Sequence, residues 1–226
     1  PRRGGASVLK QRSCALGRLS TCRFPRKNIV SQNDRDDLFS SLCPQLRTNL
    51  QKTKGALNND DRPTHCMAAV LSTVFALKHF YLETPSEFER RVAYLTAVLA
   101  FLERNARDIE NGRLALIVTA SREASLRIRS LFNALAAGLL TQARPLSYGR
   151  PGPRAFIGTA AELEEAMSQT QAAVRFLILD DAPAILANEE AARGVQRLSA
   201  RLGIASALGA CASIRSSAAA SFVNAL

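Results

Sequence analysis

Three short apolar segments limit the fold of this chain more than any other feature of its sequence. They are residues 114–119 (LALIVT), 155–158 (AFIG) and 174–179 (VRFLIL). Short, nearly continuous apolar runs of this kind are typical of strands that are buried on both faces of a sheet. Segments with helical periodicity separate them, and such alternation favours parallel strands joined by helices. The sequence therefore predicts an α/β fold with a parallel sheet flanked by helices.

The same patterns predict the remaining elements. Helices are expected at residues 38–50, 68–79, 91–107, 122–140, 161–168, 188–202 and 216–226, and weaker strands at residues 80–82 and 204–211. Clusters of Gly, Pro, Asn and Asp predict loops at residues 55–61 and 142–153. Ligands of parallel α/β sheets bind at the carboxyl ends of the strands, so the residues that directly follow each strand are the candidate site residues.

Positive charge is concentrated at the start of the chain. The 226 residues carry a net charge of +11, yet no acidic residue lies among residues 1–33. Eight basic residues lie there: Arg2, Arg3, Lys10, Arg12, Arg18, Arg23, Arg26 and Lys27. Residues 34–226 hold the other 22 of the 30 basic residues together with all 19 acidic ones. We therefore expect an extended basic arm over residues 1–33 and a nearly neutral folded domain over residues 34–226.

The arm has three interpretations. Segments rich in Arg and Ser and poor in acidic residues are typical of organelle-targeting sequences. Alternatively, the basic side chains bind the phosphates of RNA, where each one displaces condensed counterions. These two roles are compatible. In the third interpretation, the arm is a solvated tail without a partner.

Cysteine spacing and hydropathy exclude other classes. The five cysteines are scattered, and none forms a C-x-x-C pair. This predicts no structural metal site and fits a reducing compartment. No apolar run reaches the length of about eighteen residues that a membrane-spanning helix needs, so we expect no contact with a membrane.

A series of polar segments lies before, between and after the apolar runs. In chain order they are Phe39, PTHCM (63–67), ETPSEFERR (83–91), ASREAS (120–125), TAAE (159–162), DDAP (180–183) and CAS (211–213). The series resembles the motifs of the first RecA-like domain of DEAD-box RNA helicases, and the resemblance covers residues 38–226. It implies a RecA-like fold of the P-loop NTPase type. The alternative is a generic α/β domain with chance matches, in which Arg122 and Glu123 begin a solvated helix and Asp180 and Asp181 are a helix N-cap.

The segments that resemble the family's nucleotide motifs depart from its pattern. Met67 stands where the family has the Gln that reads adenine, and a thioether lacks the paired donor and acceptor of an amide. Thr84 and Ser86 keep hydroxyls of the phosphate loop, but its glycines are absent. Without glycines the backbone cannot curl round a phosphate. The family's lysine position falls on Phe88 or, in a second alignment, on Arg90, with Arg91 in place of the threonine.

Acidic residues complete this departure. Glu87 and Glu89 place negative charge where the phosphates would lie. Asp180 keeps the position that holds Mg²⁺ through water in the family, whereas Asp181 replaces its Glu and Pro183 its last Asp. We expect a vestigial nucleotide site that binds no nucleotide, metal or other cofactor and has no ATPase activity, formed by Thr84, Ser86, Asp180 and Asp181.

The segments that bind RNA in the family are only partly matched. Arg122, in ASREAS, is the residue best placed to contact a phosphate. Glu162 stands where the family has a basic residue, and its carboxylate would repel RNA. The predicted RNA contacts are therefore Arg122 and the eight basic residues of the arm.

These features together predict a function. The leading hypothesis is a non-catalytic structural protein of a ribonucleoprotein, with a mitochondrial ribosome in the matrix as its setting and rRNA and ribosomal proteins as partners. A second hypothesis is a ribosome assembly or RNA-processing factor of helicase descent. A third is a pseudoenzyme that partners a true helicase without binding RNA itself.

Overall fold

A parallel sheet forms the centre of the computed structural model, which describes residues 32–75, 82, 84, 86–104, 114–139, 155–168 and 174–202. Its three described strands are β1 (Leu114–Val118), β2 (Ala155–Gly158) and β3 (Val174–Leu179), in the order β2-β1-β3. Both pairings are parallel, with Ile117 of β1 opposite Ile157 of β2 and Ile178 of β3. The predicted α/β class and all three predicted strands are confirmed.

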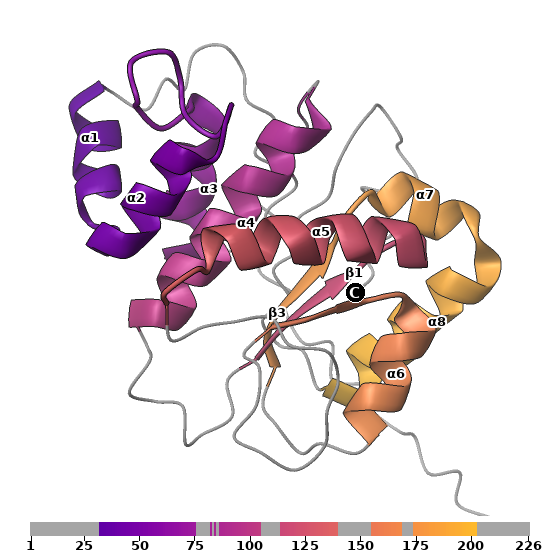
Figure 1. Cartoon of the computed structure of the whole chain (residues 1–226). Coiled ribbons are helices and arrows are strands. Elements are labelled where there is room, and N and C mark those ends of the chain that lie inside the picture. The colour runs from indigo at the N-terminus through magenta and orange to yellow at the C-terminus, as the bar shows by residue number, and fades with distance from the viewer. Residues whose placement is uncertain are drawn as a thin grey trace, which may run out of the picture.

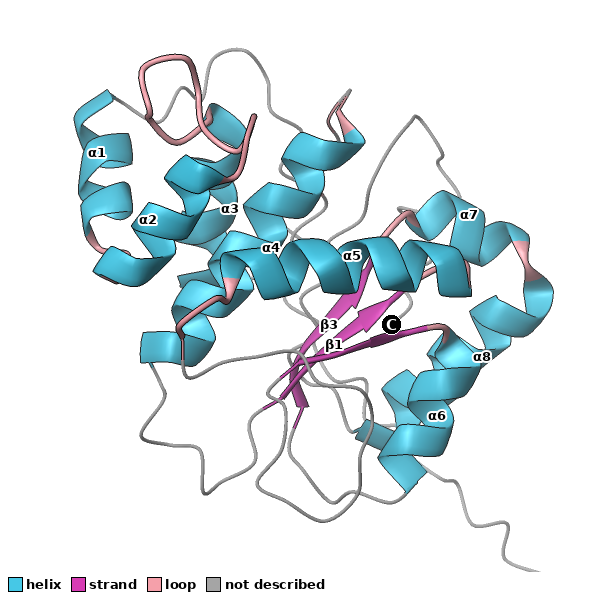
Figure 2. Cartoon of the chain, in the orientation of Figure 1, coloured by secondary structure: helices cyan, strands magenta, loops and turns pink. Residues whose placement is uncertain are grey.

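Helices cover both faces of this sheet (Figures 1 and 2). They are α1 (Gln32–Ser40), α2 (Pro44–Lys52), α3 (His65–Phe75), α4 (Glu87–Arg104), α5 (Arg122–Leu135), α6 (Ala160–Ser168), α7 (Ala182–Ala187) and α8 (Glu189–Leu202). No helix in the described ranges is long and apolar enough to cross a membrane.

Successive side chains of the strands point into two different cores. Ala115 and Ile117 of β1 belong to the core that they form with α3, α4 and α5, whereas Leu116 and Val118 belong to the core formed with α6, α7 and α8. This alternation follows from the period of two residues in a strand. It explains why the strands read as continuous apolar runs in the sequence: both of their faces are buried.

The first predicted helix, at residues 38–50, is wrong as a single element. The structure has α1 and α2 instead, separated by residues 41–43. Pro44 accounts for the break, because proline disfavours helical backbone at the residue before it and itself fits the first turn of a new helix. Helix α1 begins at Gln32, within the predicted arm. The boundary at residues 33 and 34 stays a prediction, because residues 1–31 lie outside the described ranges.

Buried Asn49 of α2 ties the N-terminal helices to the sheet domain. Its side-chain Nδ2 donates to the carbonyl oxygens of Leu135 and Ala137, each at 2.8 Å. These carbonyls belong to the end of α5, where helical carbonyls lack partners within the helix. The side chain of Asn49 therefore caps α5 from a segment 86 residues away in the sequence.

Other predicted elements end differently or fall outside the described residues. Helix α4 starts before the predicted residue 91, and α5 ends at Leu135, before the predicted residue 140. Helix α7 was not predicted. Leu82 is described and is not part of a strand, whereas residues 80 and 81 of that predicted strand lie outside the described ranges. The loop at 142–153, the strand at 204–211 and the helix at 216–226 also lie outside them.

Close packing between α6 and α8 gives a first prediction. A Cβ atom on Gly194 of α8 would lie 2.8 Å from Cβ of Ala160. Gly-to-Ala changes inside helices usually stabilise, by about 1 kcal/mol. We expect Gly194→Ala to lower the free energy of unfolding by about 1–3 kcal/mol instead, because overpacking forces the helices apart.

Urea denaturation checks this value. Gln196→Ala, at an exposed position of the same helix, is the control and is expected to change the stability by less than about 0.5 kcal/mol. A stabilised Gly194→Ala variant would show that the two helices do not pack this closely.

Candidate functional site at the carboxyl ends of the strands

The residues that follow the strands meet at one edge of the sheet. The N–H of Asp180 donates to the carbonyl of Val118 at 2.8 Å, and the N–H of Thr119 donates to the carbonyl of Gly158 at 2.9 Å. The ladder thus continues one residue past β1 and β3. Asp180 is only 1% exposed. A carboxylate so deeply buried requires partners that replace its lost hydration.

Asp180 finds these partners on α4. Arg91 donates to Oδ2 of Asp180 from Nε at 3.1 Å and from Nη2 at 2.7 Å. The hydroxyl of Tyr94 donates to Oδ1 at 3.1 Å, and Nη2 of Arg90 lies 4.0 Å from the same oxygen. Arg90 and Tyr94 are also buried. Two guanidinium groups and one phenol therefore surround a single carboxylate.

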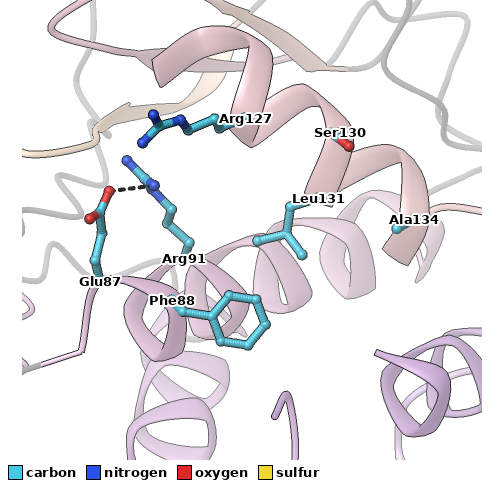
Figure 3. Close-up of a pocket in the computed structure, with 7 residues that line it drawn as sticks. All are labelled: Glu87, Phe88, Arg91, Arg127, Ser130, Leu131 and Ala134. Atoms are coloured by element: carbon cyan, nitrogen blue, oxygen red, sulfur yellow. Dashed lines mark ion pairs between the residues drawn. The ribbon is translucent and has the colours of Figure 1, made fainter. Parts of the chain in front are cut away.

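Arg91 has a second acidic partner. Its Nη1 forms an ion pair with Glu87, one turn earlier on α4. Figure 3 shows this pair at one end of a cavity of about 540 Å³ between α4 and α5, where the guanidinium of Arg127 points toward that of Arg91. Phe88, Leu131 and Ala134 supply the apolar part of the lining. Arg91 thus spans from the mouth of this cavity to the buried end of β3.

The environment shifts the pKa of both donors. Burial raises the pKa of Tyr94 well above its ordinary value, and the charge of Asp180 acts in the same direction while Arg91 opposes it. Burial alone would lower the pKa of Arg91, but hydrogen bonds to Asp180 and its charge outweigh burial and raise it. Tyr94 is therefore a neutral donor and Arg91 a cation at any physiological pH.

The loop before α4 satisfies its own hydroxyls. Oγ1 of Thr84 donates to the carbonyl of Ser86 at 2.7 Å. Oγ of Ser86 accepts the N–H of Glu89 at 3.2 Å and so caps the start of α4. The hydroxyl of Thr84 thus acts within the loop, and the hydroxyl of Ser86 acts on α4.

Comparison with solved structures identifies the architecture. Dbp5 from S. cerevisiae, bound to RNA and ADP BeF3, matches with a TM-score of 0.63 and 15% identity over 84% of this chain and 49% of that chain. Prp28 from Chaetomium thermophilum, bound to ADP, matches with a TM-score of 0.63 and 14% identity over 82% and 46%. The DEAD-box helicase Mss116, bound to ssRNA and UDP-BeF, matches with a TM-score of 0.67 and 13% identity over 84% and 42%. This chain has the fold of a DEAD-box helicase RecA-like domain.

The sequence comparisons add no closer relationship. No family model matches this RecA-like domain, and no curated protein matches it. The chain spans less than half the length of the three solved proteins. At such low identity the likeness concerns the fold.

The residues around Asp180 do not fit the Mg²⁺–nucleotide complex that the RecA-like fold implies. The guanidinium of Arg91 lies 2.7 Å from Oδ2 of Asp180, where a cation or its water would have to approach, and like charges repel. Phosphates would meet Glu87 and Glu89 on the first turn of α4. The described part of the domain also contains no group of three or more His, Cys, Asp and Glu residues that could hold a metal ion.

The four residues predicted to form a vestigial nucleotide site do not form one hydrogen-bonded group in the structure. Asp180 lies at the end of β3, and Thr84 and Ser86 lie in the loop before α4, but no hydrogen bond between the loop hydroxyls and Asp180 is present in the described residues. Asp181 adopts a left-handed backbone with φ of 61° and caps α7 by accepting the N–H of Ala184 at 3.5 Å. Asp181 thus has the N-cap role that the alternative of a generic α/β domain predicted, although the fold of this chain is RecA-like.

Of the nine predicted RNA-contact residues, the structure describes one. Arg122 is exposed on the first turn of α5, next to the N-cap Ser121. The eight basic residues of the arm lie outside the described residues, as does CAS (211–213). The assignment of these residues to RNA therefore stays a prediction.

Glu162 has a structural role that the sequence reading missed. Its carboxylate accepts the N–H of Thr159 at 3.0 Å, and the hydroxyl of Thr159 accepts the N–H of Glu162 at 3.4 Å. This reciprocal pair is a capping box at the start of α6, and the T-x-x-E spacing of TAAE is its sequence signal. The carboxylate is thus held by the backbone.

Arg91 and Tyr94 were also missed as partners of Asp180. The sequence signal for them is their spacing: they follow Glu87 by four and seven residues, which places all three side chains on one face of a helix. Nothing in the spacing indicates that this face meets the end of β3, because Asp180 follows Arg91 by 89 residues.

Cys66 of α3 gives a prediction about pH. Burial raises the pKa of its thiol from 9.0 to about 12; the charge of Glu89 adds to this, whereas Arg90 opposes it. The thiol ionises near pH 9 in the unfolded chain and only near pH 12 in the folded one, so its contribution to stability is complete below pH 9 and is lost as the pH rises toward 12.

We expect the free energy of unfolding to fall above pH 9 more steeply in the wild type than in Cys66→Ala, by up to about 1.4 kcal/mol per pH unit. Urea denaturation at several pH values between 8 and about 10.5 measures the two slopes. Because Tyr94 is unchanged in the variant, its own contribution cancels in the comparison. Parallel slopes would contradict the burial of the thiol.

Proposed function

We propose that this RecA-like domain does not hydrolyse nucleotides and serves as a structural, RNA-associated component of a ribonucleoprotein, with the mitochondrial ribosome in the matrix as its setting. The observation that carries the first part is the pairing of Asp180 with Arg91. A carboxylate that binds a catalytic metal must be accessible to that metal. The carboxylate of Asp180 is instead paired with the guanidinium of Arg91 and is 1% exposed.

The neighbouring residues support a non-catalytic role. Phosphoryl transfer depends on positioning and on positive charge around the phosphates. Here the first turn of α4 carries Glu87 and Glu89, and the loop hydroxyls of Thr84 and Ser86 bond within their own segment. Met67 is 1% exposed and packs in the core. It is therefore not accessible to the adenine base of a nucleotide.

RNA is the partner that fold and charge favour. Mss116 and Dbp5, which share the fold, were solved with ssRNA and RNA. In this chain the basic arm, with eight cations and no acidic residue among residues 1–33, would follow RNA phosphates by charge. Arg122 would add one contact from the folded domain. The remaining surface is close to neutral, so we assign it mainly to neighbouring proteins, which in a ribosome would be other ribosomal proteins.

Sedimentation of the native complex tests this function. The protein is followed by immunoblot through a gradient in high-magnesium buffer, with and without ribonuclease. Stable migration with a ribosomal subunit that is lost after digestion of the RNA would support a resident structural protein. Migration with lighter particles or subunit precursors would favour an assembly factor instead. A position that ribonuclease does not change would contradict the role in RNA association.

A parallel assay tests the absence of hydrolysis. The purified full chain is incubated with Mg²⁺, ATP and RNA, and released phosphate is measured. RNA-stimulated release that depends on Asp180 would overturn the non-catalytic proposal.

A further inference from the structure

We propose that Arg91 is a built-in substitute for ligand at the nucleotide position of this RecA-like fold. Its guanidinium supplies Asp180 with the positive charge that a bound cation would otherwise supply, and so holds α4 against the end of β3 without any ligand. The inference rests on the proposed non-catalytic function and deepens it: Asp180 has a structural role in this chain, as the counter-ion of an arginine.

The geometry of the pair is that of a fixed contact. Nε and Nη2 of Arg91 both donate to Oδ2 of Asp180, at 3.1 and 2.7 Å, while Nη1 pairs with Glu87. The planar fork of a guanidinium can serve two carboxylates in this way, whereas the ammonium of lysine acts as a single point charge. The side chain of Arg91 is 13% exposed, so water screens the contact little.

The surrounding charges balance without a ligand. Two cations, Arg90 and Arg91, face two carboxylates, Asp180 and Glu87. Tyr94 satisfies the second oxygen of Asp180 with a neutral hydroxyl. An added Mg²⁺ would disturb this balance, and so would an added phosphate. Within this group of four charged side chains, no unpaired positive charge is left to attract a nucleotide.

The contact also joins segments that are distant in the sequence. Arg91 and Asp180 are 89 residues apart, and they connect the second turn of α4 to the residue that directly follows β3. In a domain that depends on nucleotide, ligand binding raises the melting temperature. Here the corresponding stabilisation is already present in the chain.

Chemical rescue tests the proposal on the full chain. Millimolar Mg²⁺ with ATP or ADP is expected to leave the melting temperature of the wild type unchanged within about 1 °C, because a ligand that does not bind the folded state does not shift it. Arg91→Ala is expected to lower it by about 10 °C, because Asp180 loses its principal partner. Millimolar ethylguanidinium is then expected to restore part of this loss by entering the vacated space.

Two further variants make the rescue specific. In Arg91→Ala combined with Asp180→Ala, ethylguanidinium has no carboxylate to bind and is expected to restore nothing. Arg127→Ala is the matched control, because Arg127 lines the same cavity but, among the described residues, pairs with exposed Glu123 at the surface. Its melting temperature is expected to change little and not to respond to ethylguanidinium.

Several results would overturn the proposal. The first is a rise in the melting temperature of the wild type when Mg²⁺ and nucleotide are added. The second is an Arg91→Ala variant that is as stable as the wild type. The third is rescue by ethylguanidinium in the variant that also lacks the carboxylate of Asp180. If Arg91→Ala does not fold, Arg91→Lys replaces it: an intermediate melting temperature supports the need for the guanidinium fork, and a wild-type value contradicts it. Failure of rescue together with intact ribosomal sedimentation would remove this inference and leave the proposed function standing.

Discussion

Replacing the eight basic residues of the arm with glutamine is expected to weaken RNA binding by about a thousandfold at low salt. Each Lys or Arg that contacts a phosphate releases condensed counterions, so the logarithm of the affinity should fall with the logarithm of salt concentration. For eight contacts on single-stranded RNA the slope is expected to be about −6, and the variant should lose most of it. Fluorescence anisotropy with a labelled single-stranded RNA at several salt concentrations measures both quantities.

Two controls locate the effect. A chain in which the order of residues 1–33 is scrambled, with the same charge, is expected to bind as the wild type does, because counterion release depends on the number of phosphates that the basic side chains neutralise. Arg122→Gln removes one contact on α5 and is expected to reduce the slope by less than about one unit. A salt-independent affinity of the wild type would contradict the electrostatic role of the arm.

The second large effect is expected from Asp180→Ala, which should lower the free energy of unfolding by about 3–5 kcal/mol. The substitution leaves Arg90 and Arg91 without their shared carboxylate, and Arg90 is only 3% exposed. Nε of Arg90 has no hydrogen-bond partner within the described ranges, and its Nη2 lies 4.0 Å from Oδ1 of Asp180. Breaking a buried pair from one side is costly because the remaining charge stays buried.

Urea denaturation of the full chain measures this loss. Asp181→Asn is the control at the adjacent position: asparagine can cap α7 and tolerates the left-handed backbone, so we expect a change of less than about 0.5 kcal/mol. An Asp180→Ala variant that unfolds at the same urea concentration as the wild type would show that the network at the end of β3 contributes nothing to stability.

The contacts of Asp180 with α4 give this retained aspartate a different interpretation from the one that the sequence suggests. In the family that the sequence resembles, Asp at this position holds a metal, and its presence in this chain reads as a remnant of catalysis. In the structure its partners are Arg91, Tyr94 and Arg90, all from α4. The same side chain is thus suited to a structural role, as the proposed non-catalytic function requires.

Much of the fold was predictable because it depends on local patterns. The three strands were predicted from apolar runs, since strands buried on both faces lack polar positions. Pro44 at the start of α2 and the T-x-x-E pattern at Thr159 were equally local signals, although both were overlooked. Helix α7 was missed because its six residues contain Pro183 and little periodicity, so its start depends on the cap that Asp181 supplies.

The sequence by itself determined the α/β class, the concentration of positive charge in residues 1–33 and the absence of glycine from residues 83–91, because each is a property of neighbouring residues. Only the tertiary structure decided the strand order β2-β1-β3, the capping of α5 by Asn49 and the pairing of Asp180 with Arg91. These contacts join residues 86–89 positions apart. No periodicity records which face of α4 meets the end of β3; that depends on how the apolar cores pack, and packing places the arginine beside the carboxylate.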